Sequence, residues 1–318
     1  ANISPDPARV MDYSHPQKFT VTSEDGNWHK EYSVIIDTFD LPLRYDFEHY
    51  ELNETGKYQV FFEETQGTAL FKQYIWASGN SGFALTGVGR NPQEYPTVSI
   101  ENGIDGSRAI KLETKSTGQF GETVKMPIAA GNLFLGSFDV NNAVQKPLKA
   151  TRFGLPFGKK PLQLKGYYKY TPGTQPFKAK DKNAVTIPGQ EDEGDIYAVL
   201  YEAAELDGKA LDGNNVLTSE NIVALARVEV EKKDEFTAFH VDFHYGSRIP
   251  IDWPKFIQDQ RDPSDDGTAP YLSFSEEKMK NYEYNLAVVF TSSKYGAYFA
   301  GSVGSTLCID KVEIVCEK

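Results

Sequence analysis

Apolar and aromatic residues recur along this chain in short runs of period two, and turn-forming residues end each run. Such alternation places apolar side chains on one face of a β-strand and polar ones on the other. From residue 40 onward about ten runs are separated by long loops, at residues 45–50, 58–62, 109–114, 132–140, 162–170, 196–202, 221–231, 237–245, 285–292 and 306–315. Helical patterns are few, at residues 253–260 and 275–281. The pattern predicts an all-β chain in which residues 40–318 form one large jelly-roll β-sandwich.

Residues 1–39 carry a separate and shorter β pattern. Residues 19–23 and 28–36 alternate in polarity, and the turn-forming residues 24–27 join them into a predicted β-hairpin. Two strands alone bury too little surface to be stable in water. We therefore expect residues 1–39 to be a short immunoglobulin-like β segment, or an appendage packed on the main body.

Composition and charge narrow the class of partner. Forty per cent hydrophobic residues, with 18 Tyr and 20 Phe among 318 residues, favour a globular protein built from strands. The formal net charge of -12 disfavours nucleic acid, whose phosphates need a positive field, and it disfavours an anionic membrane surface. No stretch approaches the roughly 18 to 20 apolar residues of a membrane span. Acidity leaves sugars open as partners.

The start of the chain suggests that the protein is exported, and the two cysteines near its end are predicted to form no disulfide. The chain begins at Ala1 without an initiator Met or an apolar leader, so we expect a mature form whose signal sequence has been removed. We expect export to the cell surface as an outer-membrane lipoprotein, or to the periplasm, with membrane contact only through a lipid anchor outside this chain. Cys308 and Cys316 would lie roughly 26 Å apart in one extended strand, so both are predicted to be free and buried.

Residues 239–245 place three metal-ligand side chains on one strand face. The odd-numbered residues form the core face, and His240, Asp242 and His244 form the outer face. Same-face neighbours lie about 6.6 Å apart, so the two histidines would be about 13 Å apart, too far to share one ion. We predict a solvated face there and no metal site.

Calcium is considered at two places. Residues 262–267 begin like a calcium loop, but Ser273 stands where the bidentate Glu is expected, which favours an ordinary acidic loop. Alternatively, Asp46 or Glu48 and Asp310 could hold a structural calcium that joins the first and last strands of the sandwich. Calcium is thus the one cofactor that we keep as an alternative to none.

No segment carries a recognisable catalytic motif. Arg227, Glu229 and Glu231 share a strand face, and adjacent carboxylates about 6 to 7 Å apart would suit glycoside hydrolysis. Glu231, however, runs into the turn 232–234, which indicates a solvated hairpin end. The Gly-x-Ser-x-Gly elbow, the glycine-rich phosphate loop, the Cys-x-x-Cys pair and the Glu-x-Asp-x-Glu strand pattern of jelly-roll endoglucanases are all absent. Catalytic residues therefore stay unassigned.

Aromatic and polar side chains that lie close together in the sequence are the remaining candidates. In residues 162–168 the leucine side of the strand alternates with a side that carries Gln163, Lys165 and Tyr167. Sugars present flat C–H patches to aromatic rings and hydroxyl groups to polar side chains, so a sugar site needs both kinds together. The predicted ligand-binding residues are Trp76, Asn80, Arg152, Lys165, Tyr167, Tyr201 and Glu202.

Four segments resemble one known family. Residues 131–136 (GNLFLG), 166–173 (GYYKYTPG), 195–202 (DIYAVLYE) and 301–310 (GSVGSTLCID) together resemble the putative carbohydrate metabolism (PCMD) domain family of exported proteins from Gram-negative gut bacteria. The likeness covers about residues 75 to 318. It implies a jelly roll with a sugar pocket, and it implies no catalytic residue. Residues 20–34 resemble the closing hairpin of bacterial immunoglobulin-like modules.

Three functions follow, in order of preference. The first is an exported protein that binds an oligo- or polysaccharide for glycan capture or metabolism. The second is a glycoside hydrolase whose carboxylate pair comes from Glu202, Asp195 or a loop acid. The third is a structural or adhesion subunit that assembles through exposed sheet edges. A pocket with two suitably spaced acids would favour the second, and a pocket whose carboxylates are single or paired to Arg or Lys would exclude it.

Overall fold

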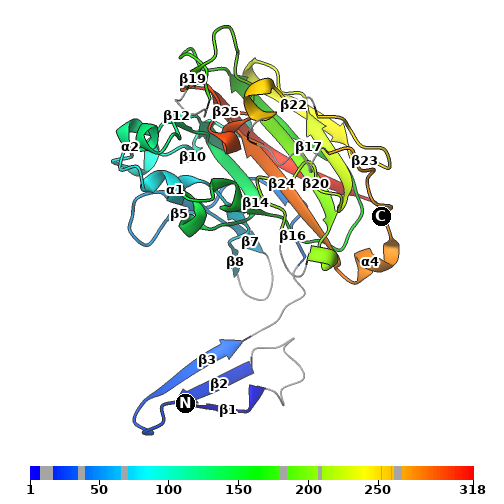
Figure 1. The fold of residues 1–318 in the computed structure, drawn as a ribbon. Helices are drawn as coiled ribbons and strands as arrows, with labels where there is room; N and C mark the ends of the chain where they lie inside the picture. Colours follow the sequence, from blue (N-terminus) through cyan, green and yellow to red (C-terminus); the bar gives the residue numbers. More distant parts are fainter. Residues whose placement is uncertain are drawn as a thin grey trace. The chain divides into compact units, whose positions relative to one another are not determined.

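The computed structural model describes residues 1–7, 17–34, 40–65, 71–179, 185–206, 210–251, 253–258, 260 and 267–318 (Figure 1). Contacts divide the chain into two compact units, Ala1–Leu41 and Pro42–Lys318. The division falls two residues beyond the boundary expected from the sequence.

The first unit is a three-stranded antiparallel sheet in the order β1-β2-β3. Its strands are β1 (Asn2–Ser4), β2 (Gln17–Thr22) and β3 (His29–Val34). The β2–β3 hairpin turns where the sequence indicated, with Gly26 in the left-handed region at a φ of 71°. The hairpin prediction is therefore confirmed, and β1 adds a strand that was not foreseen.

The second unit contains two large antiparallel sheets. The six-stranded sheet comprises β10 (Thr97–Ile100), β11 (Ala109–Glu113), β25 (Thr306–Cys316), β17 (Pro161–Thr171) and β22 (Lys233–Asp242) in that order, with β4 (Arg44–Tyr45) on β25. The eight-stranded sheet comprises β15 (Thr151–Phe153), β14 (Asn132–Phe138), β24 (Tyr284–Thr291), β20 (Asp195–Glu202), β21 (Ile222–Val228) and β23 (His244–Tyr245) in that order, with β16 (Leu155–Pro156) on β24 and β9 (Trp76–Ala77) on β14. The predicted all-β sandwich is confirmed.

The two sheets pack face to face as layers of one sandwich (Figure 1). Strand β17 contacts β20, and β11 contacts β14, across the interface. Aromatic rings join the layers: Tyr45 of the six-stranded sheet lies edge-on to Trp76 of the eight-stranded sheet, with centroids 5.0 Å apart. Trp76 in turn lies 6.1 Å from Phe290. Burial of these rings and of the aliphatic side chains around them provides the main stabilisation of the sandwich.

Short hairpins and helices surround the sandwich. The hairpins pair β5 (Tyr50–Leu52) with β6 (Gln59–Phe61), β7 (Glu63–Thr65) with β8 (Phe71–Gln73), β12 (Lys115–Ser116) with β13 (Ile128–Ala129), and β18 (Lys178–Ala179) with β19 (Val185–Thr186). The helices are α1 (Asn80–Ala84), α2 (Gly118–Thr123), α3 (Lys255–Gln258) and α4 (Glu276–Lys280). The last two lie where the sequence predicted helices. Among the described residues, no helix has the length and apolar character that a membrane crossing requires.

Two predicted strands are divided in the structure. Residues 45–50 are interrupted at Phe47, whose φ of 55° cannot continue a strand, so β4 and β5 join different sheets. Residues 237–245 are split because the chain crosses from one sheet to the other. Strand β22 pairs with β17 in the six-stranded sheet, whereas Tyr245 of β23 pairs with Ala224 of β21 in the eight-stranded sheet. The predicted faces still hold, since Phe239 is buried and His240 is exposed.

One predicted core residue lies outside the core. Leu162, assigned to the leucine face of residues 162–168, is 39% exposed, while Leu164 is fully buried. The pairing of β17 with β25 shifts register between Pro161 and Gln163. A bulge of this kind changes the face on which the following residues lie, which is why strict alternation failed at the start of this strand.

Candidate functional site

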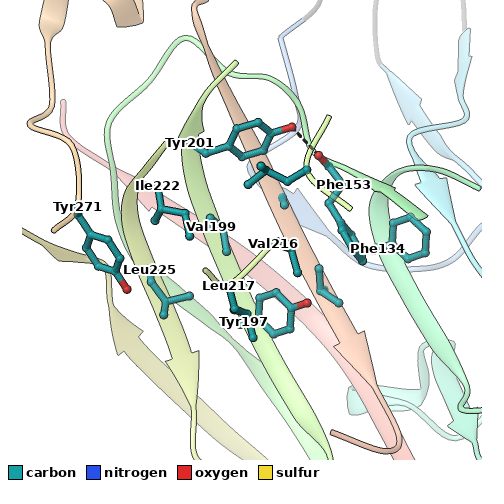
Figure 2. Close-up of a cluster of buried hydrophobic side chains, with 13 residues drawn as sticks. Phe134, Phe153, Tyr197, Val199, Tyr201, Val216, Leu217, Ile222, Leu225 and Tyr271 are labelled. Carbon is teal, nitrogen blue, oxygen red and sulfur yellow. Dashed lines mark hydrogen bonds between the residues drawn. The ribbon is translucent and has the colours of Figure 1, made fainter. Parts of the chain in front are cut away.

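The eight-stranded sheet is buried on both of its faces. One face packs against the six-stranded sheet, and the other carries a second apolar cluster that includes Phe134, Tyr197, Val199 and Leu225 (Figure 2). All eight residues of β20 are buried. This second cluster forms part of the floor of a cavity, because Phe134 and Tyr197 also line it.

The cavity on this face, called the sheet-face cavity below, has a volume of about 200 Å³. Its floor is formed by β14, β20, β21 and β24, and its walls come from the segments 79–86, 117–130, 143–151, 213–218 and 294–299, together with Ile251 and Trp253. These segments are far apart in sequence, so only the completed fold assembles the cavity. Loops over a sheet face are the usual setting of a ligand site in a sandwich.

A buried ion pair lies in the floor of the sheet-face cavity. Arg227 of β21 lies opposite Tyr197 of β20, two residues from Asp195 on the same strand face. Its Nε and Nη2 donate to the two carboxylate oxygens of Asp195 at 2.9 and 2.6 Å. Burial alone would lower the pKa of Arg227, but the adjacent carboxylate holds it above its ordinary value. The two side chains are therefore held in a bidentate geometry.

Aromatic rings and a lysine also line the sheet-face cavity. Half-buried Trp253 packs edge-on against Tyr298, with centroids 6.0 Å apart, and lies 6.4 Å from Tyr295. Lys294 Nζ lies 2.8 Å from a carboxylate oxygen of Glu193, which is mostly exposed and does not line the cavity. Burial works against the charge of Lys294, yet its contact with Glu193 leaves the pKa raised, so the ammonium group stays charged.

Thr151 supplies an unused polar atom. Thr151 lines the sheet-face cavity, and its buried Oγ1 has no hydrogen-bond partner within the described part of the chain. Native proteins rarely leave a buried hydroxyl unpaired, so a ligand hydroxyl or a water is the expected partner. Rings beside polar groups of this kind match the chemistry that binds a sugar.

Four of the predicted ligand-binding residues are buried in structural roles and do not line this cavity. Trp76 is 4% exposed, and its Nε1 donates to Glu63 at 2.7 Å. Asn80 exchanges two hydrogen bonds with the backbone of Thr97. Their side chains cannot face a ligand while these contacts hold, which corrects the expectation that both lie on a binding surface.

The same correction applies at the end of β20. Tyr201 is fully buried, and its hydroxyl donates to the carbonyl oxygen of Phe153 at 2.6 Å (Figure 2). Glu202 is 4% exposed and accepts a hydrogen bond from Lys278 of α4. Both residues fasten β20 to neighbouring elements, and neither reaches the sheet-face cavity.

The remaining three predicted residues are accessible but lie elsewhere. Arg152 is exposed on β15 and pairs with Asp139 at 3.3 Å. Lys165 and Tyr167 are half-buried neighbours on one face of β17, in the six-stranded sheet. None of the three lines the sheet-face cavity. The structure thus does not bring the seven residues together, and binding at Arg152, Lys165 or Tyr167 stays a prediction.

The cysteines and the calcium candidates also have defined surroundings. Both cysteines are free, Cys308 buried and Cys316 half-buried. Asp310 accepts hydrogen bonds from Ile104 N, Ser107 Oγ and Lys311 N, which engage both of its oxygens. The acidic loop 262–267 lies almost entirely outside the described residues. Within those that are described, no three His, Cys, Asp or Glu side chains are grouped to hold a metal ion.

Two buried carboxylates make the stability depend on pH. Burial raises the pKa of Glu63 to about 7, and burial raises the pKa of Asp192 to about 6 against the hydrogen bonds that it accepts from three serines. A carboxyl group whose pKa is higher in the folded state stabilises the fold at low pH and loses that effect as pH rises through the folded-state pKa. We expect the free energy of unfolding to be about 4 kcal/mol higher at pH 5 than at pH 8, at about 1.4 kcal/mol per pKa unit. Urea titrations across this range measure it, and Glu63→Gln should flatten the profile.

Sequence reasoning missed most of the sheet-face cavity. Asp195 and Arg227 were noted, but in separate hypotheses, and Thr151, Trp253 and Lys294 were not singled out. One signal was available: the apolar runs at 196–201 and 222–226 do not alternate. Near-continuous apolar strands indicate a sheet that is covered on both faces.

Comparison with known proteins identifies the family. The family model described as "Putative carbohydrate metabolism domain" matches residues 46–315, which confirms the resemblance seen in the sequence. A crystal structure of a putative glycoside hydrolase from Bacteroides thetaiotaomicron VPI-5482 is 41% identical, with a TM-score of 0.75, and the match covers 99% of this chain and 83% of that one. A second, from Bacteroides vulgatus ATCC 8482, is 34% identical, with a TM-score of 0.70, and covers 88% of this chain and 100% of that one. No curated protein matches. This chain is a member of the putative carbohydrate metabolism domain family.

Proposed function

We propose that this protein binds an oligo- or polysaccharide in the sheet-face cavity and acts in glycan capture or metabolism. The observation that carries the proposal is the lining of the cavity, where the rings of Trp253, Tyr295 and Phe138 lie with the polar groups of Thr151 and Asn214. Family membership supports the same class of ligand. Export, as expected from the sequence, would place this site where such glycans occur.

Replacing Trp253 with alanine should weaken glycan binding at least about tenfold, because the ring offers a flat face to the C–H patch of a sugar. A panel of plant and host glycans identifies the ligand, and titration calorimetry then compares the variants. Trp28→Ala is the matched control, since Trp28 is 78% exposed in the first unit, and it should bind like the wild type. Lys294→Gln gives a second cavity variant in case the first is poorly folded.

The same experiment separates the two candidate surfaces. Tyr167→Ala changes the face of the six-stranded sheet that the sequence predicted, and it leaves the sheet-face cavity intact. If Tyr167→Ala loses glycan binding while Trp253→Ala and Lys294→Gln bind normally, the binding site lies on the six-stranded sheet. Absence of binding to every glycan would contradict the proposal altogether.

A glycoside hydrolase is the second candidate, because two related structures carry that name. Hydrolysis with either stereochemical outcome uses two carboxyl groups about 5 to 9.5 Å apart. Among the described residues that line the sheet-face cavity, Asp195 is the one carboxylate, and Arg227 occupies both of its oxygens. We therefore favour binding without cleavage. Release of reducing sugar from a bound glycan, lost in Asp195→Asn, would reverse this preference.

The third hypothesis, assembly through sheet edges, has less support. Strand β22 forms one edge of the six-stranded sheet and carries the exposed charges of Asp234, Glu235 and Asp242. Charged side chains along an edge oppose strand addition by another chain. The cavity, and not this edge, therefore carries the proposed function.

A further inference from the structure

A second cavity, called the side cavity below, adjoins the sheet-face cavity. It has a volume of about 400 Å³ and shares six lining residues with its neighbour, including Leu148, Asn214 and Phe299. The two volumes together fall within the range of roughly 300 to 1,000 Å³ that is typical of ligand sites. The two cavities are therefore neighbours that share part of one wall.

The backbone between the two cavities is held in an unusual conformation. Phe299, which lines both, has a φ of 54° and a ψ of 34°, in the left-handed region. A residue with a Cβ is rarely found there, and such strain concentrates at ligand sites, where the surrounding structure imposes it. The short turn that ends at Phe299 therefore has a fixed shape at the junction of the cavities.

The charged side chains that line the two cavities are mostly positive, although the protein as a whole is negative. The chain carries a net charge of -12. Yet the described side chains that line the two cavities include four cations, Arg227, Lys294, Lys146 and Lys149, and one anion, Asp195. Asp195 neutralises Arg227, and the exposed Glu193 pairs with Lys294 from outside the lining. Both lysines of the side cavity remain to attract a ligand.

Lys146 and Lys149 both line the side cavity and belong to one short turn. Lys146 precedes the 3-10 turn Pro147–Lys149 and Lys149 is its last residue, and both are exposed. No ion pair with another described residue involves either one. Two positive side chains that line one cavity favour a negative group there.

We propose that the glycan bound here is acidic, and that a carboxylate or sulfate of one sugar unit lies in the side cavity between Lys146 and Lys149. This rests on the proposed function, since the neighbouring unit would occupy the sheet-face cavity. A neutral sugar needs no such lysines. An acidic glycan would also gain from them a faster approach to an otherwise repulsive surface.

The test compares matched oligosaccharides of three kinds, neutral, uronate-containing and sulfated, by titration calorimetry with the full chain. We expect the acidic kinds to bind at least about tenfold tighter than the neutral one, and to lose about tenfold in affinity between 50 and 500 mM NaCl. The uronate and sulfate arms identify which anion the site prefers. The variant K146Q/K149Q should lose most of the preference and most of the salt dependence.

The control variant is K57Q/K280Q, which removes the same charge from two exposed positions outside both cavities. It should keep the preference for acidic glycans. Equal binding of neutral and acidic glycans, or an unchanged preference in K146Q/K149Q, would overturn this inference while leaving the proposed function in place. Failure to bind any of the three kinds would count against both.

Discussion

Replacing Arg227 with methionine is expected to lower the free energy of unfolding by about 3 to 5 kcal/mol at pH 7. The change leaves the Asp195 carboxylate, which is 3% exposed, without the guanidinium that binds both of its oxygens. A buried charge that has lost its partner keeps its full desolvation cost. Urea denaturation at pH 7 measures the effect, with Arg152→Met as the matched control. Arg152 and its partner Asp139 are more exposed, so that control should cost less than about 1 kcal/mol.

A double variant tests whether the unpaired carboxylate causes the expected loss of stability in Arg227→Met. The double variant Asp195→Asn/Arg227→Met should be more stable than Arg227→Met alone, since it removes the uncompensated charge. If Arg227→Met is no less stable than Arg152→Met, the buried ion pair does not stabilise the fold more than the exposed one, and the prediction is wrong.

Replacing Trp76 with alanine should cost about 3 to 5 kcal/mol of stability, the range for removing a large aromatic side chain from a core. Trp76 joins the two layers through contacts with Tyr45, Phe47 and Phe290. The substitution also removes the indole N–H that donates to the buried carboxyl group of Glu63. Thermal and urea denaturation measure the loss, and Trp28→Ala should stay within about 0.5 kcal/mol of the wild type.

This experiment distinguishes the structural role of Trp76 from the binding role that the sequence suggested. A variant that is strongly destabilised, but that still binds glycan at low temperature while folded, has lost only packing. If Trp76→Ala has normal stability but no longer binds glycan, Trp76 contacts the ligand, which would contradict its burial between the sheets.

Much of the architecture could be predicted because strand periodicity is a local property. In the run 166–173, Tyr168 and Tyr170 alternate with polar or half-buried residues and face the core, and residues 166–171 lie in β17. The turn at Gly26 needs only a residue that tolerates a positive φ, so it too could be read locally. Bulges and crossings could not be read in this way, because they depend on the partner strand. That is why Leu162 and the strand predicted over 237–245 were misassigned.

The candidate site was less predictable, because periodicity tells which residues share a strand face and not what covers that face. Trp76 and Tyr201 looked like binding residues because aromatic rings beside polar ones suit both a core and a sugar site. Conversely, Trp253 lies next to the short helix α3 in a region without strand pattern, where the sequence offered no reason to single it out.

Local pattern and motif order were sufficient to predict the class of fold, the hairpin in the first 39 residues and the family, and they contain no known catalytic motif. The tertiary structure alone decided where a ligand could bind. Asp195 and Arg227 lie 32 residues apart and meet only through the register of β20 and β21. Lys146 and Lys149 reach the second cavity through loops that fold over the sheet. A site of this kind arises from long-range packing, which no local pattern encodes.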